Sequence, residues 1–126
     1  MDDKSQILVV DHEPEWRAFT KAVLDAEGYA VQDSGDTQSA LEIIADDGFD
    51  LIIVDALSEI LFKSLATGYK RYRLLVFTTA PSVPEAIKVY RYGALDYISK
   101  SFDSANLVND VAIALQKQPV QEIIAG

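Results

Sequence analysis

Short apolar runs, each ending in a polar residue, recur along the chain at residues 7–11, 51–55, 74–78 and 97–100. Runs this short and this rich in Val, Ile and Leu are typical of strands that are buried on both faces of a sheet. Residues 29–33 alternate between apolar and polar side chains and predict a further strand. The hydrophobic pattern therefore predicts five strands.

Segments with helical periodicity follow each of these strands. Proline in a first turn, Ser or Asp at a cap position, and Gly at a stop position mark their ends. The third segment, residues 58–65, is the weakest. The expected helix starts are Pro14, Asp36 or Thr37, Ser58, Ser82 and the residue after Asp103. Strands that alternate with helices lie parallel, so the sequence predicts an α/β fold with a parallel sheet.

The polar residues at the ends of the strands are candidates for a functional site. In a parallel sheet the C-terminal ends of the strands meet at one edge, where ligands bind. Asp11, Asp55, Thr78 and Lys100 would converge there. Two carboxylates, a hydroxyl and an ammonium form a small polar pocket that suits a cation, an acyl phosphate and the oxygens of a phosphoryl group.

The composition is that of an ordinary globular protein, with 49% hydrophobic and 25% charged residues. A chain of 126 residues is long enough for one domain with a core and too short for two. We place that domain at residues 1–117 and interpret residues 118–126 as a C-terminal tail or the start of a linker. No apolar segment approaches the ~18 residues of a membrane span, and no signal-peptide pattern is visible, so we expect no membrane association and a cytoplasmic location.

Charge and cysteine content narrow the function classes. The absence of cysteine excludes disulfides and thiolate metal sites. The net charge of −9 argues against direct binding to nucleic acid, which requires cationic side chains. The acidic excess serves solubility, a cluster of acids around a cation, or both.

Four motifs in order along the chain resemble the receiver domain of two-component response regulators. They are VVDHEPEWR, LIIVD, VFTTA and GALDYISKSFD. The resemblance covers residues 7–115. It implies a flavodoxin-like (βα)5 fold, a doubly wound parallel sheet with strand order 2-1-3-4-5.

The resemblance also implies a phosphorylation site. Asp55 would accept a phosphoryl group from a histidine kinase or a phosphotransfer protein. Asp11, Asp55 and the backbone carbonyl of Leu57 would hold Mg²⁺, an ion that prefers oxygen ligands. Lys100 would pair with one phosphoryl oxygen, and Thr78 would donate a hydrogen bond to another.

Four departures from the family's pattern bear on this chemistry. His12 stands where the family has a second acid. Imidazole is a poor ligand for Mg²⁺, so we expect weak Mg²⁺ binding. Two residues are candidates to complete the metal site: His12, acting through a bridging water, or the neighbouring Glu13. The segment from Asp55 to Thr78 is about seven residues short, or two turns of helix, so the third helix should be shortened. Ser101 replaces a proline after Lys100, and we expect a trans peptide bond there. Thr79, in a position usually held by a smaller residue, either narrows access to Asp55 or is a tolerated surface residue.

The family's switch implies an output surface. Thr78 would move toward the phosphoryl group, Tyr97 would turn inward, and the face formed by the fourth helix, fifth strand and fifth helix would change. We expect the fourth helix to present four residues to a downstream effector or a second copy of the chain: Lys88, Val89, Arg91 and Tyr92. Ile87 and Tyr90 should then point inward.

Two other functions compete with that of a phosphorylated switch. A degenerate receiver would keep the fold and act through protein contacts alone, and His12, the short segment and Ser101 favour it. An aspartate-nucleophile phosphatase needs a second acid two residues after the nucleophile, where this chain has Leu57. We therefore expect a signalling module and not an enzyme. A flavodoxin-like cofactor binder is also disfavoured, because the first strand–helix turn has no phosphate-binding glycines.

Overall fold

The computed structural model describes residues 4–46, 48–68 and 70–123. Within these residues, five parallel strands form one sheet in the order β2-β1-β3-β4-β5. The strands are β1 (Gln6–Val10), β2 (Ala30–Ser34), β3 (Leu51–Asp55), β4 (Leu74–Thr78) and β5 (Ala94–Ser99). The helices are α1 (Pro14–Ala26), α2 (Thr37–Asp46), α3 (Glu59–Ala66), α4 (Val83–Arg91) and α5 (Ser104–Gln116). The predicted flavodoxin-like fold and its strand order are confirmed.

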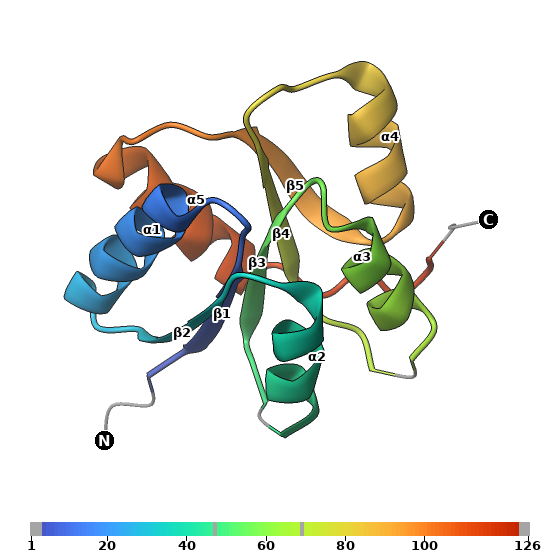
Figure 1. The fold of residues 1–126 in the computed structure, drawn as a ribbon, viewed down its shortest axis with the longest axis horizontal. Coiled ribbons are helices and arrows are strands. Elements are labelled where there is room, and N and C mark those ends of the chain that lie inside the picture. The colour runs from blue at the N-terminus through green and yellow to red at the C-terminus, as the bar shows by residue number, and fades with distance from the viewer. Residues whose placement is uncertain (1–3, 47, 69, 124–126) are drawn as a thin grey trace.

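Helices cover both faces of the sheet. In Figure 1, α1 and α5 lie on one face, while α2, α3 and α4 lie on the other. Two apolar cores result, because alternate residues of each central strand point to opposite faces. On β1, Ile7 and Val9 pack with α1 and α5, while Leu8 and Val10 pack with α2 and α3. The continuous apolar strands of the sequence are therefore buried on both sides.

The predicted helix ends are seen at several positions. The Oγ of Ser82 accepts the backbone N–H of Glu85 at 3.2 Å, which caps α4, and Oδ1 of Asp103 accepts the N–H of Asn106 at 3.0 Å, which caps α5. Gly28 and Gly93 follow α1 and α4 with φ of 93° and 99°. Only glycine adopts this left-handed conformation at little cost, which explains why both helices stop there.

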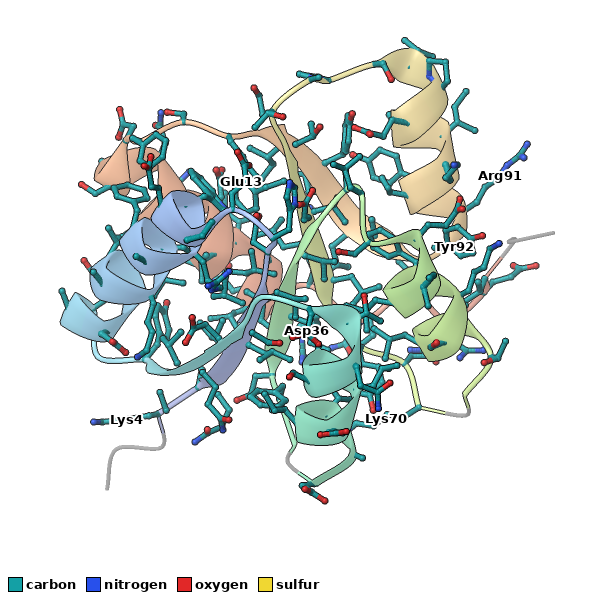
Figure 2. All side chains as sticks on the ribbon, in the orientation of Figure 1. Lys4, Glu13, Asp36, Lys70, Arg91 and Tyr92 are labelled. Atoms are coloured by element: carbon teal, nitrogen blue, oxygen red, sulfur yellow. The ribbon has the colours of Figure 1, made fainter. Side chains whose placement is uncertain are left out.

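The rotational position of α4 differs from the expectation. Val89 is fully buried and packs in the core with Phe62, whereas Ile87 and Tyr90 are about half exposed. Arg91 projects outward, and Tyr92 lies between α4 and α3, stacked on Phe62 at 5.9 Å between ring centroids (Figure 2). Of the expected partner face, Lys88 and Arg91 are exposed, Tyr92 is partly buried, and Val89 is wrongly assigned.

The correction for α4 has a physical cause. Its apolar residues form two stripes at helical spacing, Val83, Ile87 and Tyr90 on one and Ala86 and Val89 on the other. The sequence of the helix alone does not say which stripe faces the sheet. In the structure the stripe that contains Val89 is the buried one, and it shares an apolar core with residues of β4, β5 and α3.

Helix α3 has eight residues, in line with the expected shortening. Residues 117–123 run beside the segment that joins α3 to β4. The side chain of Arg73 donates to the carbonyl of Lys117 at 2.7 Å, and that of Arg71 donates to the carbonyl of Gln121 at 3.3 Å. Val120 and Ile123 face Gly93, where an added Cβ would lie 2.5 Å from Cδ1 of Ile123. The tail thus packs on the domain over this stretch, and residues 124–126 lie outside the described residues.

No helix in the described part of the chain is both long enough and apolar enough to cross a membrane.

Candidate functional site

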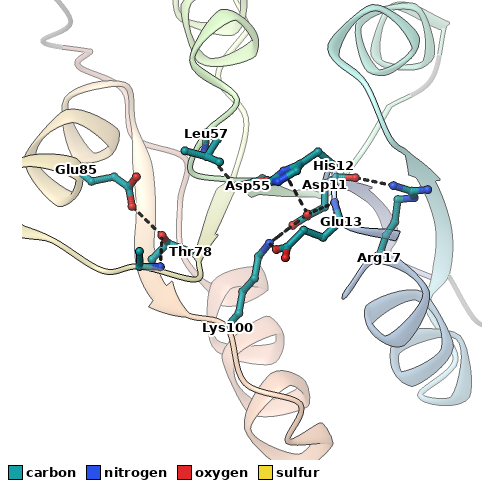
Figure 3. Close-up of polar contacts among 10 residues, drawn as sticks. Asp11, His12, Glu13, Arg17, Asp55, Leu57, Thr78, Glu85 and Lys100 are labelled. Carbon is teal, nitrogen blue, oxygen red and sulfur yellow. Dashed lines mark hydrogen bonds and ion pairs between the residues drawn. The ribbon is translucent and has the colours of Figure 1, made fainter. Parts of the chain in front are cut away.

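The polar residues predicted from the strand ends lie at one edge of the sheet. Asp55 and Thr78 are the last residues of β3 and β4, Asp11 follows β1, and Lys100 follows β5. Figure 3 shows the side chains of Asp11, Asp55 and Lys100 close together, with Thr78 at the end of the neighbouring strand, bonded to Glu85. The backbone reinforces the arrangement, since the N–H of Lys100 donates to the carbonyl of Thr78 at 2.7 Å.

Asp11 and Asp55 form a buried pair of carboxylates, each 2% exposed. Oδ1 of Asp11 accepts the backbone N–H of Glu13 at 2.9 Å, which orients the carboxylate. Burial raises the pKa of Asp11 above its ordinary value, and the negative charge of Asp55 adds to the rise. Two carboxylates in this setting attract a cation, because an added positive charge relieves both effects.

Lys100 supplies one such positive charge. Its Nζ lies 2.9 and 3.1 Å from the two oxygens of Asp11, also contacts Oε1 of Glu13, and sits 5.7 Å from the ring of Trp16. Burial opposes protonation of Lys100, but hydrogen bonds to Glu13 and Asp11 and the charges of both aspartates outweigh it and raise its pKa. The ammonium is therefore charged at neutral pH and already at the site.

His12 and Leu57 contact the two oxygens of Asp55. Nδ1 of His12 contacts Oδ2, and the backbone N–H of Leu57 donates to Oδ1 at 3.1 Å. The His12 side chain is 56% exposed, so it covers Asp55 from the solvent side. Nδ1 of His12 therefore occupies one approach to Oδ2 of Asp55.

The donor set suits a divalent cation only in part. Ligand atoms of Asp11, His12 and Asp55 lie within 4.8 Å of one another, and the two carboxylates are the oxygen ligands that Mg²⁺ prefers. The imidazole nitrogen of His12 is a ligand that Mg²⁺ disfavours. Glu13, the other candidate to complete the site, uses its carboxylate on Lys100. The part that the carbonyl of Leu57 plays stays a prediction.

Thr78 and Tyr97 are joined through Glu85, a residue in the first turn of α4 that was not among the predicted site residues. The hydroxyl of Thr78 donates to Oε1 of Glu85 at 2.8 Å, and the hydroxyl of Tyr97 donates to the same oxygen at 2.5 Å. Burial raises the pKa of Tyr97, and the bond to Glu85 adds to the rise. Nothing in the sequence identified this contact, because it depends on how α4 sits above β4 and β5.

Arg17 is a second residue that sequence reasoning missed. Its Nη1 donates to the backbone carbonyl of Asp11 at 2.7 Å (Figure 3). Its Nε donates to Oδ2 of Asp33 at 3.0 Å. A Cβ at Gly35 would lie 2.9 Å from Nη1, so the guanidinium packs closely against this glycine. Arg17 thus ties the loop that carries Asp11 to β2.

An open pocket of about 520 Å³ adjoins the carboxylates between the start of α1 and the loop after β5. Its lining residues are His12, Glu13, Pro14, Glu15, Trp16, Thr79, Lys100 and Phe102. Thr79 is exposed at this rim. The peptide bond between Lys100 and Ser101 is trans, as expected for a non-proline residue.

Comparison with known proteins identifies a family. The family model described as "Response regulator receiver domain" matches residues 7–112. Among solved structures, the chemotaxis response regulator CheY4 of Vibrio cholerae has a TM-score of 0.80 at 24% identity, covering 89% of this chain and 99% of its own. A putative response regulator from Chloroflexus aurantiacus has a TM-score of 0.83 at 25% identity, covering 91% of this chain and 100% of its own.

Curated relatives are longer than this chain. Response regulator ArlR of Staphylococcus aureus is 29% identical over 124 residues, which cover 95% of this chain and 57% of that protein. The chain therefore spans just over half the length of the curated relatives it matches.

Proposed function

The chain belongs to the family of response regulator receiver domains, and we propose that it accepts a phosphoryl group on Asp55 and switches between two conformations in response. The observation that carries the proposal is the buried pair of Asp11 and Asp55 with the ammonium of Lys100 beside it. Receiver domains are signalling modules, and the proposed donor is a histidine kinase or a phosphotransfer protein.

Phosphoryl transfer forms one bond and breaks another. Oδ2 of Asp55 attacks phosphorus, the bond from phosphorus to the donor's imidazole nitrogen breaks, and the released imidazole takes a proton from solvent. A carboxylate is a poor nucleophile toward an anionic phosphoryl group unless nearby positive charge offsets the repulsion. Lys100 provides one positive charge, and its move from Asp11 to a phosphoryl oxygen keeps it paired. Held by Asp11 and Asp55, Mg²⁺ would supply the remaining charge.

The partner surface has to be redefined from the structure. Lys88 and Arg91 keep their place in it, and Ile87 and Tyr90, which are about half exposed, replace Val89 and Tyr92 as its apolar part. Exposed apolar residues beside cations are typical of protein-binding surfaces. We propose that this face of α4 contacts a downstream effector protein or domain, or a second copy of the chain. One protein with a similar fold, the beryllofluoride-activated NtrC4 receiver domain, has a solution structure as a dimer.

Intact-mass measurement tests the proposal. The protein is incubated with acetyl phosphate and Mg²⁺, next to the variant Asp55→Asn, which keeps the size of the side chain but lacks the nucleophilic oxygen. We expect one phosphoryl adduct on the wild type and none on the variant. An unmodified wild-type protein would instead support a degenerate receiver that acts through protein contacts alone.

A further inference from the structure

Glu85, in the first turn of α4, lies between the two residues of the proposed switch. One of its oxygens accepts hydrogen bonds from the hydroxyls of both Thr78 and Tyr97. The hydroxyl oxygen of Tyr97 in turn accepts the backbone N–H of Ser82 at 3.1 Å. The ends of β4 and β5 are thereby tied to the N-terminal turn of a single helix.

The carboxylate of Glu85 does not cap its own helix, because it accepts hydrogen bonds from Thr78 and Tyr97. In a capping box the acid at this position accepts the backbone N–H of the cap residue, which here is Ser82. That N–H bonds Tyr97 instead, and only the other half of the box, from Glu85 N–H to Ser82 Oγ, is formed. Glu85 therefore stabilises the positions of Thr78 and Tyr97 and not the end of its own helix.

The hydroxyl of Thr78 can serve only one acceptor at a time. A hydroxyl has a single proton, so Thr78 donates either to Glu85 or to a phosphoryl oxygen on Asp55. The bond to Glu85 is charge-assisted and the Thr78 side chain is buried, both of which strengthen it. Turning Thr78 toward a phosphoryl group requires breaking that bond.

We propose that Glu85 is a positioning residue that holds Thr78 and Tyr97 in the unphosphorylated arrangement and competes with the phosphoryl group for the Thr78 hydroxyl. The inference rests on the proposed function, because it needs a phosphoryl group on Asp55 as the competitor. When Thr78 leaves Glu85, the first turn of α4 loses this hydrogen bond to β4, and its hydrogen bonds to Tyr97 remain. The exposed residues Ile87 and Tyr90 lie on the same helix, so the exchange of this one hydrogen bond connects the site to the partner surface.

Affinity for beryllofluoride, a phosphoryl mimic, tests the competition in an equilibrium measurement. In the presence of Mg²⁺ we expect Glu85→Ala to lower the apparent Kd about tenfold, since the bond that opposes binding is gone. In a Thr78→Ala background the same substitution should change nothing, because no hydroxyl remains to be released. Glu85→Gln, which keeps an acceptor oxygen without the charge, should fall between wild type and Glu85→Ala.

A matched control separates the hydrogen bond from the charge. Glu59→Ala removes a carboxylate that pairs with Lys88 of α4, and it makes no contact with Thr78 or Tyr97 in the described structure. It should leave the Kd for beryllofluoride within about twofold of wild type. An equal gain from Glu85→Ala with and without the Thr78 hydroxyl, or no gain at all, would overturn the proposal.

A second measurement needs no phosphoryl mimic. The backbone N–H of Ala80 donates to the hydroxyl oxygen of Thr78 at 3.2 Å, so its hydrogen exchange reports whether Thr78 is held in place. We expect Ala80 to exchange several-fold faster in Glu85→Ala than in Glu59→Ala. Unchanged exchange would contradict the proposal. If the wild type failed to bind beryllofluoride at all, the proposed function would fall, and this exchange would still decide whether Glu85 positions Thr78.

Discussion

His12 is the residue in which the site departs most from the chemistry that the family implies. It stands beside two buried carboxylates and contacts the proposed nucleophilic oxygen of Asp55. A carboxylate at this position would add an oxygen ligand, whereas the imidazole adds a nitrogen that Mg²⁺ disfavours. If Asp55 accepts a phosphoryl group as proposed, the same side chain would have to leave Oδ2 first.

Replacing this residue tests its effect on the cation. We expect His12→Asp to tighten Mg²⁺ binding about tenfold or more, because a third carboxylate joins Asp11 and Asp55. Calorimetry or the fluorescence of Trp16, which lies near Lys100, provides the titration. His12→Gln is the control, since it removes the contact with Asp55 without adding a carboxylate. Equal Kd values for His12→Asp and wild type would discard this account of His12.

Residues at strand ends were predictable, and residues placed by helix packing were not. Asp11, Asp55, Thr78 and Lys100 each follow an apolar run, and in a parallel sheet that position alone sets which edge they share. Glu85 reaches the site only because α4 lies across β4 and β5, a tertiary relation with no local signal. The contact between His12 and Asp55 likewise depends on the path of one loop.

At the scale of elements, the ends of α4 were predicted correctly, but the face that it buries was not. Its start at Ser82 and its stop at Gly93 follow from local chemistry, a capping hydroxyl and a glycine with positive φ. Its rotation does not, because two apolar stripes compete for the core. In the structure Val89 is buried in the core and Tyr92 stacks on Phe62 of α3.

The cap of α5 offers a test of local stability. Asp103→Ala removes the carboxylate that accepts the N–H of Asn106, and we expect the free energy of unfolding to fall by about 1 kcal/mol. Ser104→Ala, at the exposed first residue of the same helix, is the control and should change it little. Urea titration measures both. A loss for Ser104→Ala as large as that for Asp103→Ala would mean that the cap is not the cause.

The hydrogen bond between Tyr97 of β5 and Glu85 of α4 should make the free energy of unfolding depend on pH. Burial and the bond to Glu85 raise the pKa of Tyr97 above its ordinary value of 10.0. Because the folded state binds the phenolic proton more tightly than the unfolded chain, Tyr97 contributes stability at lower pH that is lost as the pH rises from about 10 through the folded pKa.

We therefore expect wild type to lose more free energy of unfolding than Tyr97→Phe when the pH rises from about 9 to about 11. Urea titrations at the two pH values measure the difference. Parallel losses in the two proteins would show that the pKa of Tyr97 is not raised in the folded state.

At the scale of the whole molecule, the described part of the tail completes the domain beside α3. Val120 and Ile123 approach Gly93, Arg71 donates to the carbonyl of Gln121, and Arg73 donates to that of Lys117, just before the tail. Residues 118–126 were interpreted as a tail or the start of a linker, and no local sequence pattern indicates these contacts. The apolar runs predicted five strands in a parallel sheet, and the strand order was expected from the resemblance of the motifs to the family.

Replacing Val120 and Ile123 together by Ser should lower the free energy of unfolding by about 1–3 kcal/mol, because partly buried apolar surface is lost. The exposed Glu122 between them provides the control, Glu122→Ser. Urea titration of the three proteins measures the effect. A double variant as stable as wild type would mean that the tail contributes nothing to the fold.

The measurement that tests the central claim most directly locates the phosphoryl group on the chain. Borohydride reduces an aspartyl phosphate to homoserine, and peptide mapping by mass spectrometry then identifies the modified residue. After incubation with acetyl phosphate and Mg²⁺, the account predicts homoserine at position 55 and at no other aspartate. Homoserine at a different position, or none in a protein that carries the phosphoryl adduct, would contradict it.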